Sequence, residues 1–272
     1  MFEIQPITGV FGAEIHGIDL GMDPDADTLA ALRKAFLDYK VLVFPGQLGL
    51  KPAHLVALGR HFGELEIHPF HPHLDDHPEV IILRSDKTGA PRENWHSDVS
   101  FRETPSLGSI LAAVDVPPYG RDTAFADMEA VYGSLSAPMQ RMLADLQGVH
   151  DWRHVFGEKG RGGYSRQDGG SEGEMPPARH PLVRTHPQTG RKCIYVNPVF
   201  TTHIAGMHRD ESAAVLRMLY DKINLPEHQL RCRWAPGTVA MWDNRSVQHA
   251  LVFDRAYPRV MHRVTIIGDR PA

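Results

Sequence analysis

The sequence predicts a mainly β protein with flanking helices (α+β), arranged as a jelly roll. Short apolar runs bounded by glycine and proline recur along the chain, which is typical of short β-strands. A few runs with helical spacing lie among them, without the regular strand–helix alternation of a doubly wound sheet. The chain has 272 residues and 42% of them are hydrophobic, enough to build one large domain or two small ones.

The N-terminal part predicts short strands, then a helix, then a buried strand. Residues 2–18 alternate loosely between apolar and polar and are interrupted by glycines. Apolar residues at helical spacing from 29 to 36 follow Asp25 and Asp27, either of which can cap a helix. The apolar run 41–44 stops at a Pro-Gly pair, so it is expected to be a buried strand.

The middle of the chain predicts three more helices and two more strands. Helical spacing marks residues 55–62, 127–135 and 138–146, and apolar runs mark strands at 79–83 and 109–114.

A glycine-rich segment follows at about 157–177. It holds seven glycines, several charges and almost no large apolar residue, so it buries too little surface to offset its ordering entropy. We expect a flexible loop, which is either a lid over a site or a surface insertion.

The C-terminal third returns to β character. One helix is expected over 210–223 with Asp210 as its cap. The expected strands are 182–185, 192–196, 229–234, 238–242 and 260–267.

Charge and hydropathy exclude several classes of function. The net charge is -4, with no cluster of Lys or Arg that would indicate nucleic-acid or membrane-surface binding. No apolar stretch reaches the length of a membrane span, and no secretory signal is visible, so a cytoplasmic protein is expected. Cys193 and Cys232 then fit buried thiols better than a disulfide.

The 17 histidines raise the question of which ones converge on a metal. Iron(II) oxygenases use two imidazoles and one carboxylate on one face of the ion, often written as H-x-D plus a remote His. This spacing occurs three times, at His73/Asp75, His96/Asp98 and His208/Asp210. The first lies in a Pro-rich loop and the third at a helix start. The second lies at a plausible strand edge, where side chains two apart share a face.

The third ligand has to come from a strand far along the chain. His249 stands between the apolar runs 238–241 and 251–252, in a context that fits a ligand and a buried core histidine about equally. On local pattern alone, His96 and Asp98 also remain compatible with an ordinary solvated pair.

Three long motifs resemble one family. The runs WHSDVSFRETP at 95–105, WDNRSVQH at 242–249 and RVMHRVTIIGDRP at 259–271 are similar to the taurine dioxygenase / 2,4-dichlorophenoxyacetate dioxygenase family. The resemblance runs nearly end to end. It implies a single dioxygenase domain over residues 1–272 with a double-stranded β-helix (clavaminate synthase-like) fold, and a homodimer or homotetramer.

The resemblance implies an oxidoreductase that uses Fe(II), 2-oxoglutarate and O2. His96, Asp98 and His249 match the metal ligands. Arg259 matches the arginine that pairs with the far carboxylate of 2-oxoglutarate, where a bidentate guanidinium is better suited than an ammonium. Thr123 matches a hydroxyl that helps to hold the same molecule.

The resemblance also implies a pocket for a small anionic substrate. Arg263 matches a substrate-anion contact, and it lies four residues after Arg259 in a strand-like run, so both can face one interior. Without the resemblance, ordinary surface salt bridges would explain both arginines. The other matching positions are His68, Val99, Phe101, Phe156 and Phe200, of which the apolar ones fit a plain core equally well.

Two departures bear on the substrate. His71 stands where taurine dioxygenase has a substrate-contacting tyrosine, and Arg92 stands near the position of an asparagine. A taurine-like alkanesulfonate, cleaved to aldehyde and sulfite, is the first expectation. An alkyl sulfate, an aryloxyalkanoate or another small carboxylate is the alternative. Outside the oxygenases, the alternatives are a metal-dependent hydrolase and a non-catalytic jelly-roll binding protein.

Overall fold

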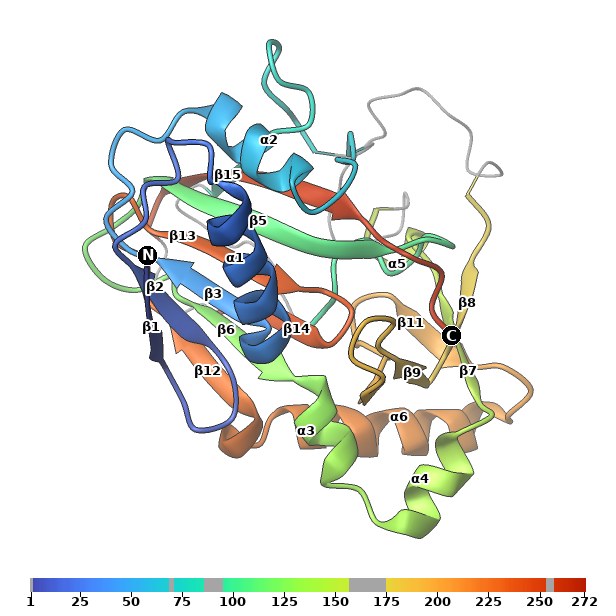
Figure 1. The fold of residues 1–272 in the computed structure, drawn as a ribbon. Helices are drawn as coiled ribbons and strands as arrows, with labels where there is room; N and C mark the ends of the chain where they lie inside the picture. Colours follow the sequence, from blue (N-terminus) through green and yellow to red (C-terminus); the bar gives the residue numbers. More distant parts are fainter. Residues whose placement is uncertain (1, 69–70, 86–94, 157–174, 253–256) are drawn as a thin grey trace.

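A seven-stranded sheet forms the main layer of the computed structural model, which describes residues 2–68, 71–85, 95–156, 175–252 and 257–272. Its strand order is β1-β2-β3-β13-β5-β15-β4, and every pair is antiparallel except β2 with β3 (Figure 1). Its strands are β1 (Glu3–Pro6), β2 (Ala13–His16), β3 (Val41–Phe44), β4 (Ile81–Ser85), β5 (Ser106–Asp115), β13 (Val239–Asp243) and β15 (Arg259–Ile267).

Three smaller sheets complete the β structure. They have the orders β12-β6-β14, β11-β7-β8 and β10-β9. Their strands are β6 (Thr123–Asp127), β7 (Gln147–His150), β8 (Ala178–Pro181), β9 (Val183–Thr185), β10 (Lys192–Ile194), β11 (Thr201–Ile204), β12 (Gln229–Cys232) and β14 (Val247–Leu251). The predicted jelly roll with few helices is confirmed, although the pattern of residues did not predict β6, β7, β8 or β11.

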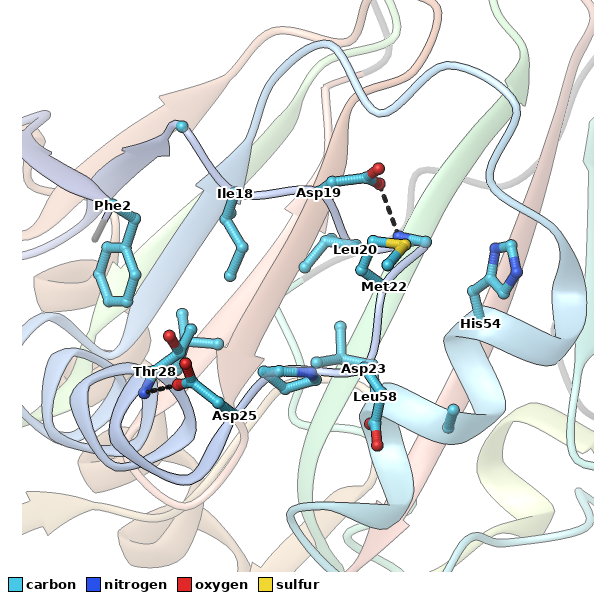
Figure 2. Close-up of a pocket in the computed structure, with 15 residues that line it drawn as sticks. Phe2, Ile18, Asp19, Leu20, Met22, Asp23, Asp25, Thr28, His54 and Leu58 are labelled. Carbon is cyan, nitrogen blue, oxygen red and sulfur yellow. Dashed lines mark hydrogen bonds between the residues drawn. The ribbon is translucent and has the colours of Figure 1, made fainter.

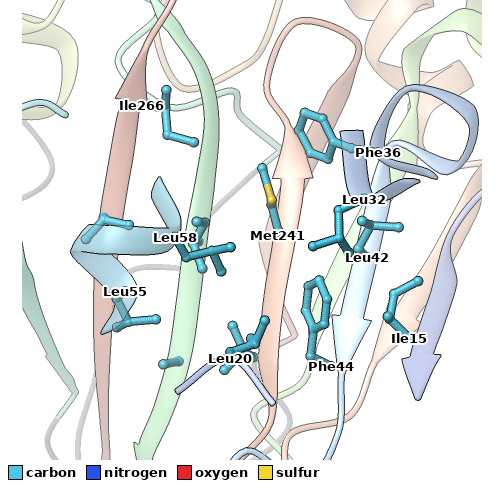
Figure 3. Packing of buried hydrophobic residues seen from close by; sticks show 14 of the residues in the cluster. Ile15, Leu20, Leu32, Phe36, Leu42, Phe44, Leu55, Leu58, Met241 and Ile266 are labelled. Carbon is cyan, nitrogen blue, oxygen red and sulfur yellow. The ribbon is translucent and has the colours of Figure 1, made fainter. Parts of the chain in front are cut away.

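Alternation along the central strands divides the interior into two cores. In β13, Val239 and Met241 point to one side of the large sheet, and Ala240 and Trp242 point to the other. The first side packs against α1 (Ala26–Tyr39) and α2 (Pro52–Arg60), as Figure 3 shows for part of this cluster. The second side packs against β6, β12 and β14, so the large sheet and this small sheet form the two layers of the roll.

The helices begin where polar side chains can cap them. Asp25 accepts a hydrogen bond from the Thr28 backbone N–H at 2.7 Å at the start of α1. Asp127 caps α3 (Met128–Gly133), and α4 (Ala137–Leu143) and α5 (Arg153–Phe156) follow. The prediction for α6 was wrong in its cap: the helix spans Arg209–Ile223 with His208 at the N-cap, and Asp210 lies inside its first turn.

A third apolar cluster lies under α3 and α6. These helices pack against the β9–β10 hairpin and β11, and Cys193 is a free, buried thiol within it. Cys232 is also free and buried, so both thiols are as predicted. In the parts of the chain that the structure describes, we find no helix with the length and apolar character of a membrane span.

Candidate metal and co-substrate site

His96 and His249 are brought together by backbone pairing. An isolated antiparallel bridge joins them, with N–H···O distances of 3.0 Å from His96 to His249 and 2.9 Å in return. Their ring centroids are 4.2 Å apart. His249 belongs to β14, so the small sheet holds one imidazole directly and positions the other through this bridge.

Asp98 adds a carboxylate to the two imidazoles. Its Oδ1 lies 4.0 Å from Nε2 of His96 and 3.9 Å from Nε2 of His249. Its Oδ2 accepts from the Ser109 hydroxyl at 2.7 Å and lies 3.4 Å from the Asn244 amide nitrogen. These bonds turn Oδ1 towards the histidines. Two nitrogens and one carboxylate oxygen fit iron(II), because this donor set on one face leaves other positions open.

The segment that carries Asp98 is not the strand that the sequence predicts. Beyond the bridge at His96 the chain makes a turn, and Val99 has a φ of 47°. The Asp98 backbone N–H donates to Asn244 Oδ1 at 3.1 Å, and the indole N–H of Trp242 donates to the same oxygen at 3.0 Å. Tertiary hydrogen bonds to the loop after β13, rather than strand alternation, therefore orient Asp98.

The other two H-x-D pairs do not form comparable groups. Over the described ranges, His96, Asp98 and His249 are the one set of three His, Cys, Asp or Glu residues whose ligand atoms all lie within 4.8 Å. His208 is occupied as the N-cap of α6, and the His73 ring lies 3.2 Å from the neighbouring Leu74 carbonyl.

Arg263 reaches the metal-ligand group from β15. Its Nη1 donates to Asp98 Oδ1 at 2.7 Å, and its side chain is buried. Burial acts to raise the pKa of Asp98, but the positive charges of Arg263 and the nearby histidines outweigh it, so this pKa lies below its ordinary value. Asp98 is therefore ionised at neutral pH, as a metal ligand has to be.

Arg259 and Thr123 lie at the predicted co-substrate end. Arg259 is buried on the same face of β15 as Arg263, and its Nη1 donates to the Arg121 carbonyl at 2.9 Å. Thr123, two residues further along the chain, is buried at the start of β6, and its hydroxyl accepts from the Trp234 indole N–H at 3.0 Å. The two predicted residues are thus fixed around one short segment of backbone.

His68 and His71 form a neutral pair beside this group. Their ring centroids are 4.5 Å apart, and His68 Nδ1 accepts from the His71 backbone N–H at 3.3 Å. Burial lowers the pKa of His68 to about 2 and that of His71 to about 4, and the charge of Arg263 acts in the same direction. With Nδ1 accepting, neutral His68 carries its proton on Nε2 and can donate it to an anion.

The predicted apolar residues form one wall. Val99, Phe101, Phe156 and Phe200 belong to a single buried cluster together with Trp152. Phe156 lies edge-on to both His68 and His71, with centroids 6.2 and 6.0 Å apart. At the other end Phe200 lies edge-on to His96 at 6.4 Å. The wall therefore spans from the neutral histidine pair to the metal-ligand group.

Several positioning residues were missed by sequence reasoning. Asn244 stands inside the 242–249 motif but received no role, and Ser109 gave no signal at all. Buried Glu66 and half-buried Arg102 also border the metal-ligand group and form an ion pair of 2.6 Å. Because Glu66 precedes His68 by two residues, an extended chain places both side chains on one face, and this spacing could have pointed to Glu66. Arg92 and most of the glycine-rich segment lie outside the described residues.

A separate cavity of about 480 Å³ lies between the loop before α1 and the helix α2 (Figure 2). Ile18, Leu20 and Leu58 are among the residues that line it, and the Asp19 and Asp25 carboxylates near its rim accept backbone N–H groups. None of the residues predicted for the metal, the co-substrate or the substrate lines it.

Comparison with known proteins agrees with this geometry. The family model described as taurine catabolism dioxygenase TauD, TfdA family matches residues 3–265. An alpha-ketoglutarate-dependent sulfonate dioxygenase of Saccharomyces cerevisiae is 35% identical, over 99% of this chain and 68% of that protein. An alpha-ketoglutarate-dependent sulfate ester dioxygenase of Pseudomonas putida is 32% identical, over 99% and 90%.

A solved structure extends the agreement to three dimensions. The crystal structure of AAD-2 in complex with Mn(II) and N-oxalylglycine superposes with a TM-score of 0.83 at 29% identity, covering 100% of this chain and 99% of that one. The chain belongs to the TauD/TfdA family of dioxygenases, oxidoreductases that use iron(II), 2-oxoglutarate and O2.

Proposed function

We propose that this dioxygenase oxidises a small anionic substrate, most directly a taurine-like alkanesulfonate. The observation that supports the proposal is the burial of two imidazoles and a carboxylate beside Arg263 and neutral His68. Hydroxylation of the carbon that bears the sulfonate gives an unstable adduct, which separates into an aldehyde and sulfite. Substrate, oxygen and 2-oxoglutarate are then consumed together, and aldehyde, sulfite, succinate and carbon dioxide are formed.

Each part of the site has a proposed task. Bound iron(II), with 2-oxoglutarate and oxygen, supplies the oxidation of the substrate C–H bond. His96, Asp98 and His249 would hold the metal, and Arg259 with Thr123 would bind the far carboxylate of 2-oxoglutarate. Arg263 and the Nε2 proton of His68 would bind the substrate anion.

The apolar wall and His71 complete the proposed pocket. Val99, Phe101, Phe156 and Phe200 would exclude water and hold the alkyl part of the substrate against the metal-ligand group. His71 packs on His68 and Phe156 and would border the substrate at that end of the wall.

The substrate class is open to a direct test. Alkyl sulfates are the second candidate, because one relative is a sulfate ester dioxygenase. Aryloxyalkanoates and other small carboxylates are further alternatives, because Arg263 and His68 also suit a carboxylate. The experiment supplies iron(II), 2-oxoglutarate and oxygen with taurine, longer alkanesulfonates, alkyl sulfates or aryloxyalkanoates, and measures succinate. The proposed substrate class predicts the largest substrate-dependent succinate formation with a sulfonate. A larger response to another class would overturn it.

The two arginines have separable roles. Arg259→Ala should raise the 2-oxoglutarate KM by at least about tenfold, because it removes one charge-assisted, bidentate carboxylate contact. Arg263→Ala should instead raise the KM for the sulfonate, measured on protein with full iron content because Arg263 also donates to Asp98 Oδ1. Steady-state kinetics with each substrate varied in turn measures both effects, and the reverse pattern would exchange the two assignments.

We further propose that residues 1–272 form a single dioxygenase domain and that the protein is a cytoplasmic homodimer or homotetramer. Light scattering of the purified protein would give its mass in solution. A monomer at micromolar concentration would contradict the proposed assembly.

A further inference from the structure

Glu66 faces the same interior as His68. The chain is extended here, so alternate side chains point to opposite sides: Ile67 is 56% exposed, whereas Glu66 and His68 are 6% and 4% exposed. The Glu66 backbone N–H donates to the Thr265 carbonyl at 2.9 Å. This bond ties Glu66 to β15, the strand that carries Arg263.

Arg102 is the direct partner of Glu66. Its Nη2 lies 2.6 Å from Glu66 Oε1. Among the described residues, neither carboxylate oxygen of Glu66 has a hydrogen bond beyond this ion pair. Burial raises the pKa of Glu66, and the charges of Arg102 and Arg263 oppose that rise. The charges of Arg263 and Glu66 therefore act on each other.

The charges around the proposed anion position are balanced. Arg102 and Arg263 are positive, Glu66 and Asp98 are negative, and His68 is neutral. Apart from Arg102, whose side chain is 34% exposed, these side chains are buried, so their charges act more strongly on one another than they would on the surface. In the loaded protein, the charges of iron(II) and Arg259 would offset those of Asp98 and the two carboxylates of 2-oxoglutarate. Glu66 would then remain as the negative group that opposes a second charge on an incoming anion, beside the positive charges of Arg102 and Arg263.

We propose that Glu66 is a specificity-determining residue that limits the substrate to singly charged anions, such as sulfonates and sulfate esters, and rejects doubly charged ones, such as phosphonates. The inference rests on the proposed function, because it takes Arg263 and His68 as the anion-binding groups. A sulfonate and a phosphonate have nearly the same tetrahedral shape. Shape alone therefore cannot separate them, whereas the repulsion from Glu66 can.

The test compares taurine with 2-aminoethylphosphonate, and ethanesulfonate with ethylphosphonate. Calorimetry measures the Kd of each for protein loaded with iron(II) and 2-oxoglutarate without oxygen, at a pH where the phosphonates are doubly charged. The proteins are wild type, Glu66→Gln, Arg102→Gln and the double variant. Glu79→Gln is the matched control, because it removes the carboxylate of the exposed Arg60–Glu79 ion pair.

An electrostatic role of Glu66 and a purely structural role predict different Kd ratios. If Glu66 acts through its charge, the phosphonate-to-sulfonate Kd ratio falls at least about tenfold in Glu66→Gln and rises in Arg102→Gln. The ratio returns close to wild type in the double variant and is unchanged in Glu79→Gln. The proposal is overturned if the Kd ratio is unchanged in Glu66→Gln. It is also overturned if affinity for the sulfonate and for the phosphonate falls equally in all three pocket variants.

The outcome also separates this inference from the proposed function. A wild-type protein that makes succinate with a sulfonate but shows no charge dependence of the ratio refutes the role of Glu66 alone. A wild-type protein that binds no sulfonate refutes the sulfonate proposal as well.

Discussion

Three side chains hold the Asp98 carboxylate in place. Ser109 and Asn244 hold one of its oxygens, and Arg263 holds the other. The family motifs contain Asp98, Asn244 and Arg263 but did not predict that these residues contact one another, and nothing in the neighbours of Ser109 marks it. Short motifs reveal ligands, whereas the contacts that orient ligands join segments that meet only in the folded chain.

Removing the Ser109 hydroxyl should weaken metal binding. Ser109→Ala leaves Asp98 Oδ2 with only the longer Asn244 contact, so the carboxylate is less well oriented. We expect manganese(II) affinity to fall by roughly 10- to 100-fold in a titration followed by electron paramagnetic resonance. Ser134→Ala, which removes a hydroxyl bonded to the Val131 carbonyl at the end of α3, is the control. Equal affinities in the two variants would contradict this role.

His68 should make the protein less stable in acid. Its pKa falls from 6.5 to about 2 on folding, so between these values only the unfolded chain binds its proton. Stability therefore decreases as the pH falls through 6.5. His68→Asn cannot take up this proton. Between about pH 7.5 and about pH 5.5 it should lose about 1.4 kcal/mol less unfolding free energy than wild type, measured by urea denaturation. The same loss in both proteins would contradict the burial of a neutral His68.

Among the secondary-structure elements, the strands with apolar sequences were predicted, and strands with polar sequences were missed. The runs that became β3 and β13 are apolar on both faces, because each strand separates two cores, and they were predicted. The strands β7 and β8 contain polar residues such as His150 and His180, which are buried through hydrogen bonds to side chains or backbone carbonyls, so they carried no hydrophobic pattern. The strand predicted around Asp98 was wrong for a related reason, because hydrogen bonds to Asn244 hold this segment in a turn.

Because β5 packs closely against β13, any side chain at Gly108 should lower the free energy of unfolding. A Cβ at this position would lie 2.7 Å from the Trp242 carbonyl oxygen and 3.2 Å from Phe36 Cζ. Because the backbone oxygen cannot move without breaking the sheet, Gly108→Ala should destabilise the fold by about 1–3 kcal/mol in chemical denaturation. Gly133→Ala meets nothing within 4 Å at the end of α3 and should be neutral or stabilising by up to about 1 kcal/mol. Equal effects would contradict the packing.

At the scale of the whole molecule, the sequence predicted the class of fold but not how its distant parts pair. Composition and short strands favoured a jelly roll, and the family motifs implied its double-stranded form. The bridge between His96 and His249 joins two residues that are far apart in the sequence, and no local pattern encodes such a pairing. The same holds for the ion pair between Glu66 and Arg102, whose partners come from different segments.

Of the three H-x-D pairs, His96 and Asp98 are the one that we propose to hold the iron together with His249. The most direct measurement is oxygen-dependent succinate formation with a sulfonate, in parallel with metal content, for alanine variants of His96, His249, His73 and His208. We expect loss of bound iron and of succinate formation in the variants of His96 and His249, and near wild-type values in the variants of His73 and His208. Full activity in His96→Ala, or its loss in His73→Ala with the fold intact, would contradict it.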